Sequence, residues 1–309
     1  MVSEVYFDMN AKLKKEDTGI MDSIEFFLPD FYSRCRLILL VHDMMDKYPD
    51  YFFERAKITA AYGCFPGSIW NGGRIMLGSC TKQEIQYVQN ELNSRGIALR
   101  FTFTNPLIEE KHLQDTFCNL CLQLTDNGMN EILVNSPVLE KYIRSNYPSF
   151  PLISSTTKCL RSADAITEEL EKDYRLVVLD SAFNNTPSLF EMPHKDKIEL
   201  LVNHYCQDDC PRREAHYREV GKCQLEFSET DFESCRFIKR DFYQIMKNSS
   251  FITVEDIFGR YSDAGFCHFK LDGRAFNKYK VIESFVYFLA RPECRDEVRL
   301  AILKSIDKL

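Results

Sequence analysis

Eight short apolar runs, separated by longer helix-like segments, constrain the fold of this chain most strongly. The runs are 23–28, 57–62, 97–102, 131–135, 151–155, 175–180, 198–203 and 266–271. Several of them are continuously apolar, as expected for strands that are buried on both faces of a parallel sheet. Eight βα units in this order predict an α/β fold, a (β/α)8 barrel of the TIM type.

Helix signals and chain length support one barrel domain over 1–309. In the segment 81–96, Thr81 is a candidate N-cap, Glu84 completes a capping box, and Gly96 ends the helix. We expect the final helix at 279–289. A barrel commonly occupies a chain of this length as one domain. The connection between the seventh and eighth strands is too long for an ordinary loop, so we expect 204–257 to be a functional, cysteine-rich insertion.

Composition narrows the class of protein. The net charge of −7 and the pI near 5.5 lack the basic footprint of a nucleic-acid binder, so nucleic acid is not favoured as a partner. The sequence contains no apolar run long enough to span a membrane and no secretory signal, which predicts a cytoplasmic protein. In a reducing compartment the twelve cysteines are expected to be thiols or metal ligands rather than disulfides.

Four cysteines gather in the insertion and are candidate metal ligands. They are Cys206, Cys210, Cys223 and Cys235. Four thiolates suit an iron–sulfur cluster or a structural zinc, and the alternative is ordinary buried cysteine. Cys118 and Cys121 form a closer pair, but apolar residues recur around them at helical spacing, so a packed helix face is predicted there.

Polar residues follow most of the predicted strands, at the end where barrel enzymes bind their ligands. The series is Tyr62, 70–74, Asn105, Asn135, 155–157, Asp180 and Asn203 followed by His204. From it we expect Asn105, Asn135 and Asn203 to bind substrate and Asp180 to be catalytic. The alternative is that such residues cap the helices that follow them.

Two histidines and four cations flank the same region. His204 and His216 are candidate proton-transfer groups because imidazole titrates near neutral pH, and the alternative is a structural histidine. Candidate carboxylate-binding residues are Arg212, Arg213, Lys270 and Arg274. For these cations the alternative is solvated loop charge.

The segment around the last predicted strand resembles a known family. Residues 264–274 read AGFCHFKLDGR, which resembles the "aG…fKIEGR" signature of the collagenase-like peptidase family of unassigned mechanism, with Leu271 and Asp272 as departures. Cys235 followed by Arg236, and then 246–249, are similar to the family's cysteine-arginine and "MNSKDL" order. Segment 203–211 stands in place of the family's "HGalC…sGrCllS", with a shorter cysteine spacing and without its glycine and serine.

The resemblance implies a barrel-type catalytic domain that holds a [4Fe-4S] cluster. Cys206, Cys210 and Cys235 match the family's cysteine order, and Cys223 fits by order alone. Better-understood branches are oxygen-independent hydroxylases of tRNA, rRNA or ubiquinone precursors, with prephenate as the oxygen donor in several cases. Short chains are similar to the ubiquinone branch, whose members work in pairs, so a paired subunit of the same family is a candidate partner.

The leading expectation is therefore an iron–sulfur enzyme of the hydroxylase type, acting on a small, carrier-bound or RNA substrate. One alternative is a peptidase of the same family, although the sequence shows no serine-hydrolase, zinc-protease or cysteine-protease motif. The other is a non-catalytic binding protein that is stabilised by zinc.

Overall fold

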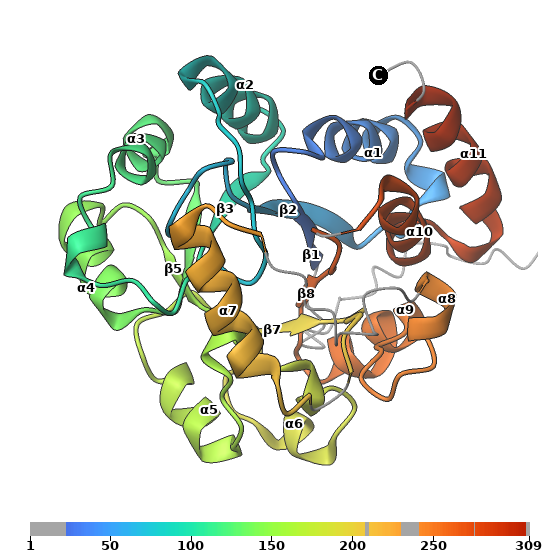
Figure 1. Ribbon diagram of the computed structural model, residues 1–309. Helices are drawn as coiled ribbons and strands as arrows, with labels where there is room; N and C mark the ends of the chain where they lie inside the picture. Colours follow the sequence, from blue (N-terminus) through green and yellow to red (C-terminus); the bar gives the residue numbers. More distant parts are fainter. Residues whose placement is uncertain (1–22, 208–209, 230–240, 275, 307–309) are drawn as a thin grey trace, which may run out of the picture.

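Eight parallel strands close into a barrel in sequence order, with β8 pairing with β1 (Figure 1). The computed structural model describes residues 23–207, 210–229, 241–274 and 276–306. The strands are β1 (Ile24–Pro29), β2 (Ala56–Gly63), β3 (Ala98–Phe103), β4 (Glu131–Val134), β5 (Leu152–Ser154), β6 (Leu176–Val178), β7 (Ile198–Leu201) and β8 (His268–Lys270). Each strand overlaps its predicted run, so the predicted TIM-type barrel is confirmed.

Helices alternate with the strands and surround the barrel. They are α1 (Cys35–Lys47), α2 (Lys82–Asn93), α3 (Thr116–Thr125), α4 (Pro137–Asn146), α5 (Ala163–Leu170), α6 (Pro187–Glu191), α7 (Arg213–Glu226), α8 (Phe242–Ile245), α9 (Val254–Asp256), α10 (Lys278–Leu289) and α11 (Arg295–Ile306). The predicted capping box of α2 is present, with Thr81 and Glu84 bonding to each other's backbone N–H. Within the described ranges, no helix is long and apolar enough to cross a membrane.

One helix prediction was wrong. The sequence pattern at 279–289 corresponds to α10, but α11 follows it and packs against both α10 and α1. The apolar signal of α11 is weak because only Val298 and Ile302 of this helix are fully buried. A short turn that begins at Pro292 separates the two helices.

The hydrophobic core has an outer and an inner part. The outer part lies between the strands and the helices, and it contains Cys118 and Cys121, which are fully buried on α3 as predicted. The inner part fills the barrel and includes Phe27, Tyr62 and Leu133. Side chains alternate between the two parts along each strand because successive residues of a strand point to opposite faces.

The barrel interior also holds a chain of buried charges. Arg100 on β3 lies 2.7 Å from the carboxylate of Glu131 on β4, pairs with Glu199 on β7, and has its guanidinium 3.8 Å from the ring centre of Phe27. Glu199 also lies 3.3 Å from the amine of Lys270 on β8. A buried charge destabilises the fold unless it is paired. Removing one of these residues would therefore leave its partner as an unpaired buried charge and lower the stability of the protein.

The connection between β7 and β8 is long, as the sequence predicted, and α7 lies across the mouth of the barrel (Figure 1). The Asn105 amide donates to the Gly221 carbonyl oxygen over 3.0 Å. The Gln224 amide donates to the carbonyl oxygens of Ser68 and Met76, each over 3.0 Å. These contacts join α7 to the loops that follow β2 and β3, so the helix is an integral cover of the mouth.

Candidate functional site

A small cavity of about 70 Å³ lies at the carboxyl ends of the strands, under α7. Its lining includes Tyr62, Arg74, His204, Tyr217, Lys270, Asp272 and Arg274. A cavity of this measure has room for roughly five water-sized groups. Three of its lining residues are Lys or Arg and one is a carboxylate, so it presents an excess of positive charge within an acidic protein.

Asp272 and His204 face each other in this cavity. The Nδ1 atom of His204 lies 3.5 Å from Oδ2 of Asp272, and Arg74 lies 3.7 Å from the same oxygen. Burial alone would raise the pKa of Asp272, but His204 and Arg74 outweigh it and hold the pKa well below its usual value. Asp272 is therefore a fixed negative charge at neutral pH.

The backbone around Asp272 is held by neighbouring groups. Asn203 accepts a hydrogen bond from the Asp272 N–H over 2.6 Å, and its amide donates to Ser284 over 2.9 Å. The Gly273 N–H donates to Oδ1 of Asp272 over 2.8 Å, which leaves Oδ2 directed at His204 and Arg74. Asn203 thus positions the carboxylate and has no free amide proton in this arrangement.

The ring of His204 is buried beside Asp272. Its side chain is 7% exposed, and neither nitrogen has a hydrogen-bond partner among the described residues. A buried imidazole normally has such partners, and here Oδ2 of Asp272 lies 3.5 Å from Nδ1. The two side chains thus form a histidine–carboxylate pair in the wall of the cavity.

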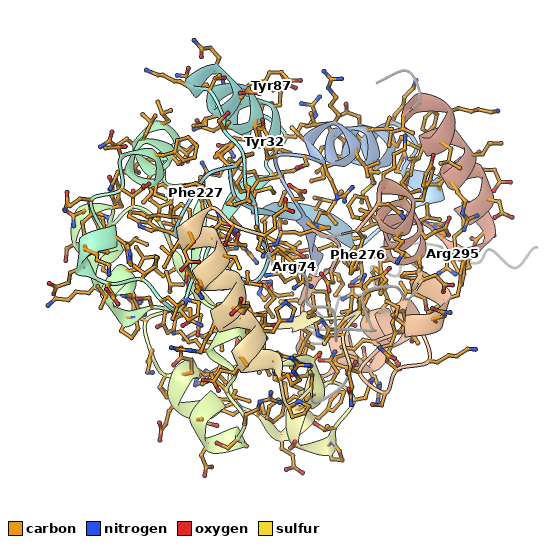
Figure 2. The ribbon with its side chains drawn as sticks, viewed as in Figure 1. Tyr32, Arg74, Tyr87, Phe227, Phe276 and Arg295 are labelled. Atoms are coloured by element: carbon orange, nitrogen blue, oxygen red, sulfur yellow. The ribbon has the colours of Figure 1, made fainter. Side chains whose placement is uncertain are left out.

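The two arginines of the cavity differ in the number of hydrogen bonds that their guanidinium groups donate. Arg274 donates to Thr102 over 2.8 Å, to Asn71 over 3.1 Å and to the Gly72 carbonyl oxygen over 2.8 Å. Arg74 donates to the Gly73 carbonyl oxygen over 2.7 Å, and its Nε has no hydrogen-bond partner among the described residues. Arg74 lies at the centre of the barrel mouth beside α7 (Figure 2). It is therefore the better placed of the two to hold an anion.

Lys270 is the third cation of the cavity. Its amine lies 4.1 Å from the ring centre of Tyr62 and 3.3 Å from Glu199. Burial lowers the pKa of this amine, Glu199 opposes that effect, Arg100 and Arg274 add to it, and the resulting pKa is about 8. A fraction of Lys270 is thus neutral at ordinary pH.

The predicted strand-end series divides into two groups. Tyr62, Arg74, His204 and the hydroxyl residues 155–157 line the cavity, as expected for the carboxyl ends of strands. The lining does not include Asn105, Asn135, Asp180 and Asn203. The Asn135 amide donates to Thr157, a lining residue, over 2.8 Å, and the Asn105 amide donates to Gly221 of α7. Both amides therefore bind residues that surround the cavity. Their role in substrate binding stays a prediction.

Asp180 and Arg213, predicted for separate roles, pair with each other. Asp180 caps the short helix η4 (Ser181–Phe183) and receives a hydrogen bond from Arg213 at the start of α7. Burial raises the pKa of Asp180, and the charge and hydrogen bond of Arg213 more than reverse this, so the pKa is lowered. The pair anchors the first turn of α7.

The other predicted residues of this helix lie outside the cavity lining. Arg212 is exposed where α7 begins. His216 is partly buried on α7, where burial lowers its pKa to about 4 and the charges of Arg74 and Arg212 contribute. His216 is therefore a neutral imidazole at physiological pH. This protonation state suits a structural role or a proton acceptor better than a proton donor.

Three of the four predicted cysteine ligands lie in the described part of the chain, at different positions before and along α7. Cys206 lies close enough to Arg74 and Arg213 to raise the pKa of both guanidinium groups. The backbone of Cys210 accepts a hydrogen bond from the Arg213 N–H at the start of α7. Cys223 is buried ten residues further along this helix, which corresponds to about 15 Å of helix rise.

Cys235 lies outside the described residues. Among the residues that are described, no three His, Cys, Asp or Glu side chains are placed to share a metal ion. The ligand role of the four cysteines and both cofactors stay predictions of the sequence.

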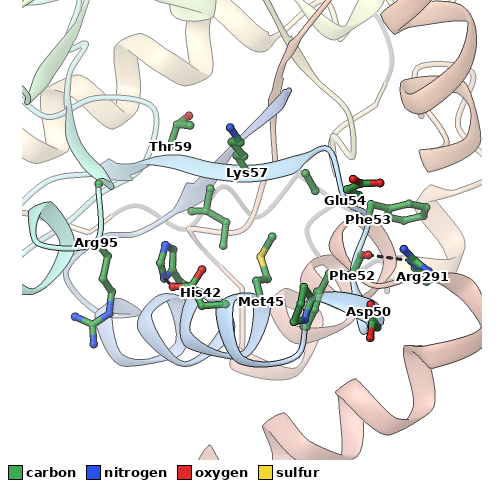
Figure 3. A pocket seen from close by; sticks show the side chains of 15 residues that line it. His42, Met45, Asp50, Phe52, Phe53, Glu54, Lys57, Thr59, Arg95 and Arg291 are labelled. Atoms are coloured by element: carbon green, nitrogen blue, oxygen red, sulfur yellow. Dashed lines mark hydrogen bonds and ion pairs between the residues drawn. The ribbon is translucent and has the colours of Figure 1, made fainter. Parts of the chain in front are cut away.

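A second cavity, of about 720 Å³, lies at the opposite end of the barrel between α1 and the start of β2 (Figure 3). Its lining includes His42 and the charged residues Asp46, Asp50, Glu54, Lys57, Arg95 and Arg291. Arg291 is committed to the Phe52 carbonyl oxygen over 3.0 Å. The lining carries both signs of charge, and this end of a barrel normally serves stability rather than chemistry.

Sequence reasoning did not single out two residues of the site. Tyr217 lines the cavity from α7, and Asp272 was interpreted only as a departure from a family signature. Asp272 follows Lys270 by two positions at the end of β8, and this spacing places both side chains on the same side of the strand. The alternation of side chains along the last strand could therefore have placed Asp272 beside Lys270. No comparable pattern in the sequence pointed to Tyr217.

Fold and site together define a TIM-type barrel protein with a positively charged cavity at the carboxyl ends of its strands. No family model matches the sequence, and no curated protein matches it. A solved structure described as the U32 peptidase Mk0906 is similar, with a TM-score of 0.52 and 13% identity over 85% of this chain and 98% of that chain. At this identity the similarity shows a shared fold.

Proposed function

We propose that this chain is an enzyme that binds a small carboxylate in the cavity at the barrel mouth and transfers a proton through His204. The positive charge of the cavity carries this proposal, because Arg74 and Arg274 line it with the single lining carboxylate of Asp272, while Lys270 has Glu199 3.3 Å away. Excess cationic charge in a buried site is stabilised by an anionic ligand. Arginine suits a carboxylate in particular, since it can bind both oxygens by parallel hydrogen bonds.

The cavity residues would have two roles, binding of the carboxylate by the arginines and proton transfer by His204 and Asp272. Arg74 would hold the carboxylate, because its side chain donates one hydrogen bond among the described residues where that of Arg274 donates three. Arg274 would contribute charge and fix the wall through its bonds to Thr102 and Asn71. His204, with Asp272 beside it, would act as the general acid and base.

The size of the cavity sets the size of the ligand. A volume of about 70 Å³ accepts a molecule with only a few heavy atoms while α7 is in place. A peptide, or an acid as large as prephenate, would enter only after the contacts of Gly221 and Gln224 with the barrel had opened.

Calorimetric titration with pyruvate and with pyruvamide tests the carboxylate site. The two molecules have nearly the same shape, but only pyruvate is charged, so we expect binding of pyruvate alone. Arg74→Ala should weaken that binding at least tenfold, the equivalent of about 1.4 kcal/mol. Arg218→Ala is the matched control, since Arg218 is exposed on the outer face of α7. Absence of pyruvate binding, or equal binding by the Arg74 variant, would refute the proposal.

For the reaction class, we carry forward the oxygen-independent hydroxylase expected from the family resemblance, with prephenate as oxygen donor and a second subunit of the family as partner. Two observations support it. Lys270 and Arg274, which belong to the resembling signature, both line the cavity, and Cys206 lies near Arg74. If present, a [4Fe-4S] cluster would supply electron transfer or an iron site for substrate. A cytoplasmic location likewise stays a prediction.

Purification without oxygen tests the cofactor. Brown protein with iron and sulfide that are lost in Cys206→Ser and Cys210→Ser would support the cluster, and Cys118→Ser is the control in the buried core of α3. Colourless protein that contains zinc would support the alternative of a zinc-stabilised protein, because the zinc ion has no visible transitions. Protein with neither metal would refute both.

A peptidase is the second candidate, because the similar solved structure is described as a U32 peptidase, the collagenase-like family. Hydrolysis of gelatin by the purified chain would support it. Cleavage should then require release of α7, so a variant with a weakened α7 anchor should be faster than wild type. No cleavage by either protein would refute this candidate.

A further inference from the structure

We propose that Lys270 is a nucleophile that forms an imine with the carbonyl carbon of a small 2-oxo acid. The inference rests on the carboxylate site proposed above and narrows its ligand to a class. A 2-oxo acid carries a carbonyl next to its carboxylate, so an anion held by Arg74 would present that carbonyl to the interior of the same cavity. Pyruvate, with six heavy atoms, matches the space for roughly five water-sized groups.

The position of Lys270 supports a reactive role. Its side chain is 6% exposed, yet it lines the cavity from the last residue of β8. Asp272 lines the cavity two residues later, so the amine and the His204–Asp272 pair share one chamber. The amine packs over the ring of Tyr62 at 4.1 Å, which shields one side of it from water.

The charges around Lys270 favour its neutral form. Glu199 is its ion-pair partner at 3.3 Å, but the same carboxylate also pairs with Arg100, which is fully buried. One carboxylate thus serves two cations, and Arg274 adds a third positive charge nearby. The pKa of about 8 that results leaves about half of the amine unprotonated at pH 8. An unprotonated, poorly solvated lysine is the form that attacks carbonyl groups.

The reaction balances with groups that are present. The Lys270 nitrogen forms a bond to the carbonyl carbon, the carbonyl oxygen takes a proton, and the nitrogen loses one, which gives a carbinolamine. The carbon–oxygen bond then breaks as its oxygen takes a second proton from solvent, water leaves, and the carbon–nitrogen double bond forms. No oxidant or reductant is required. The imine withdraws electrons from the neighbouring carbon, which prepares the ligand for proton abstraction there.

Reductive trapping tests the inference. The full chain is incubated with pyruvate and sodium cyanoborohydride, and the modified lysine is located by peptide mass spectrometry. We expect one carboxyethyl group on Lys270, formed faster as the pH rises through about 8. Lys270→Arg should remove it.

Lys158 provides the matched control. It follows β5 at the same end of the barrel, is 15% exposed and lies 4.5 Å from the ring centre of Tyr174, but its amine is 2.6 Å from the Glu169 carboxylate. Lys158→Arg should therefore leave trapping unchanged. Urea unfolding of Lys270→Arg and Lys270→Met checks that the variants fold, and loss of trapping in a folded variant supports the inference.

The outcomes separate the two proposals. If pyruvate binds by calorimetry but no carboxyethyl group appears on Lys270, the nucleophile is refuted and the carboxylate site stands. Equal modification of Lys270 and surface lysines would also refute it. If pyruvate does not bind at all, the carboxylate site itself is refuted.

Discussion

The side-chain amide of Asn105 donates a hydrogen bond to the main-chain oxygen of Gly221, 3.0 Å away, and so fixes the middle of α7 over the barrel mouth. The helix and the loop approach so closely here that a Cβ atom on residue 221 would lie 2.4 Å from Oδ1 of Asn105. A glycine at this position of α7 therefore has a packing reason, although glycine lowers helix propensity.

We predict that Gly221→Ala loosens α7. Overpacking a close contact of this kind costs about 1–3 kcal/mol, which should appear as a lower urea midpoint or as faster proteolysis within α7. Lys222→Ala, at the exposed neighbouring position, should change little. If both variants matched wild type in stability and in proteolysis, α7 would not depend on this contact.

The barrel was predictable from the sequence because buried parallel strands are apolar throughout, and such runs are visible without any knowledge of tertiary contacts. The site was only partly predictable. The amides of Asn105 and Asn203 stand at strand ends as expected, but they bond to α7 and to the backbone of Asp272. Sequence position places a side chain at the mouth of the barrel, but its hydrogen-bond partners come from distant segments.

We predict unequal effects for two adjacent arginines of α7. Arg213→Ala removes the hydrogen-bonded partner of Asp180 and leaves its buried carboxylate only Arg161, 3.9 Å away, so the loss should approach the roughly 3–5 kcal/mol of a broken buried ion pair. Arg212→Ala changes an exposed residue and should stay within about 0.5 kcal/mol of wild type. Chemical denaturation of both variants measures the difference. Equal stability would show that the Asp180–Arg213 pair does not anchor α7.

We predict that His268 makes stability depend on pH. Burial lowers the pKa of its ring, but contacts with Cys267 and Glu25 outweigh burial and raise the pKa to about 9. A folded-state pKa above the unfolded value of about 6.5 means that the stabilisation is complete below that pH and is lost as the pH rises toward 9. The unfolding free energy should therefore fall by roughly 1–3 kcal/mol across this window.

His268→Gln should flatten that decline. Lys270 acts in the opposite direction between about pH 8 and 10.5, since its folded-state pKa is lowered, so the comparison is sharpest from pH 6.5 to 8. His194→Gln is the matched control because its ring lies 3.1 Å from Glu171 on the surface, where such a pair contributes little. A profile for His268→Gln that parallels wild type would contradict the prediction.

The last prediction concerns the charge of Asp272. This carboxylate offsets part of the positive charge of the cavity and lies beside His204 and Arg74. Asp272→Asn keeps the shape and an oxygen that can accept the Gly273 N–H, but it removes the negative charge.

We expect Asp272→Asn to bind pyruvate about three- to tenfold more tightly, because one repulsive charge is gone and Arg74 loses a competing partner. At low pyruvate concentration, trapping at Lys270 should rise by the same factor, since trapping requires bound pyruvate. Calorimetry and trapping rates on the same preparation measure both effects, and Asp263→Asn, at an exposed position before β8, is the control. Weaker binding in the Asp272 variant would instead assign this carboxylate to organising the anion site, with Arg74 dependent on it for its position.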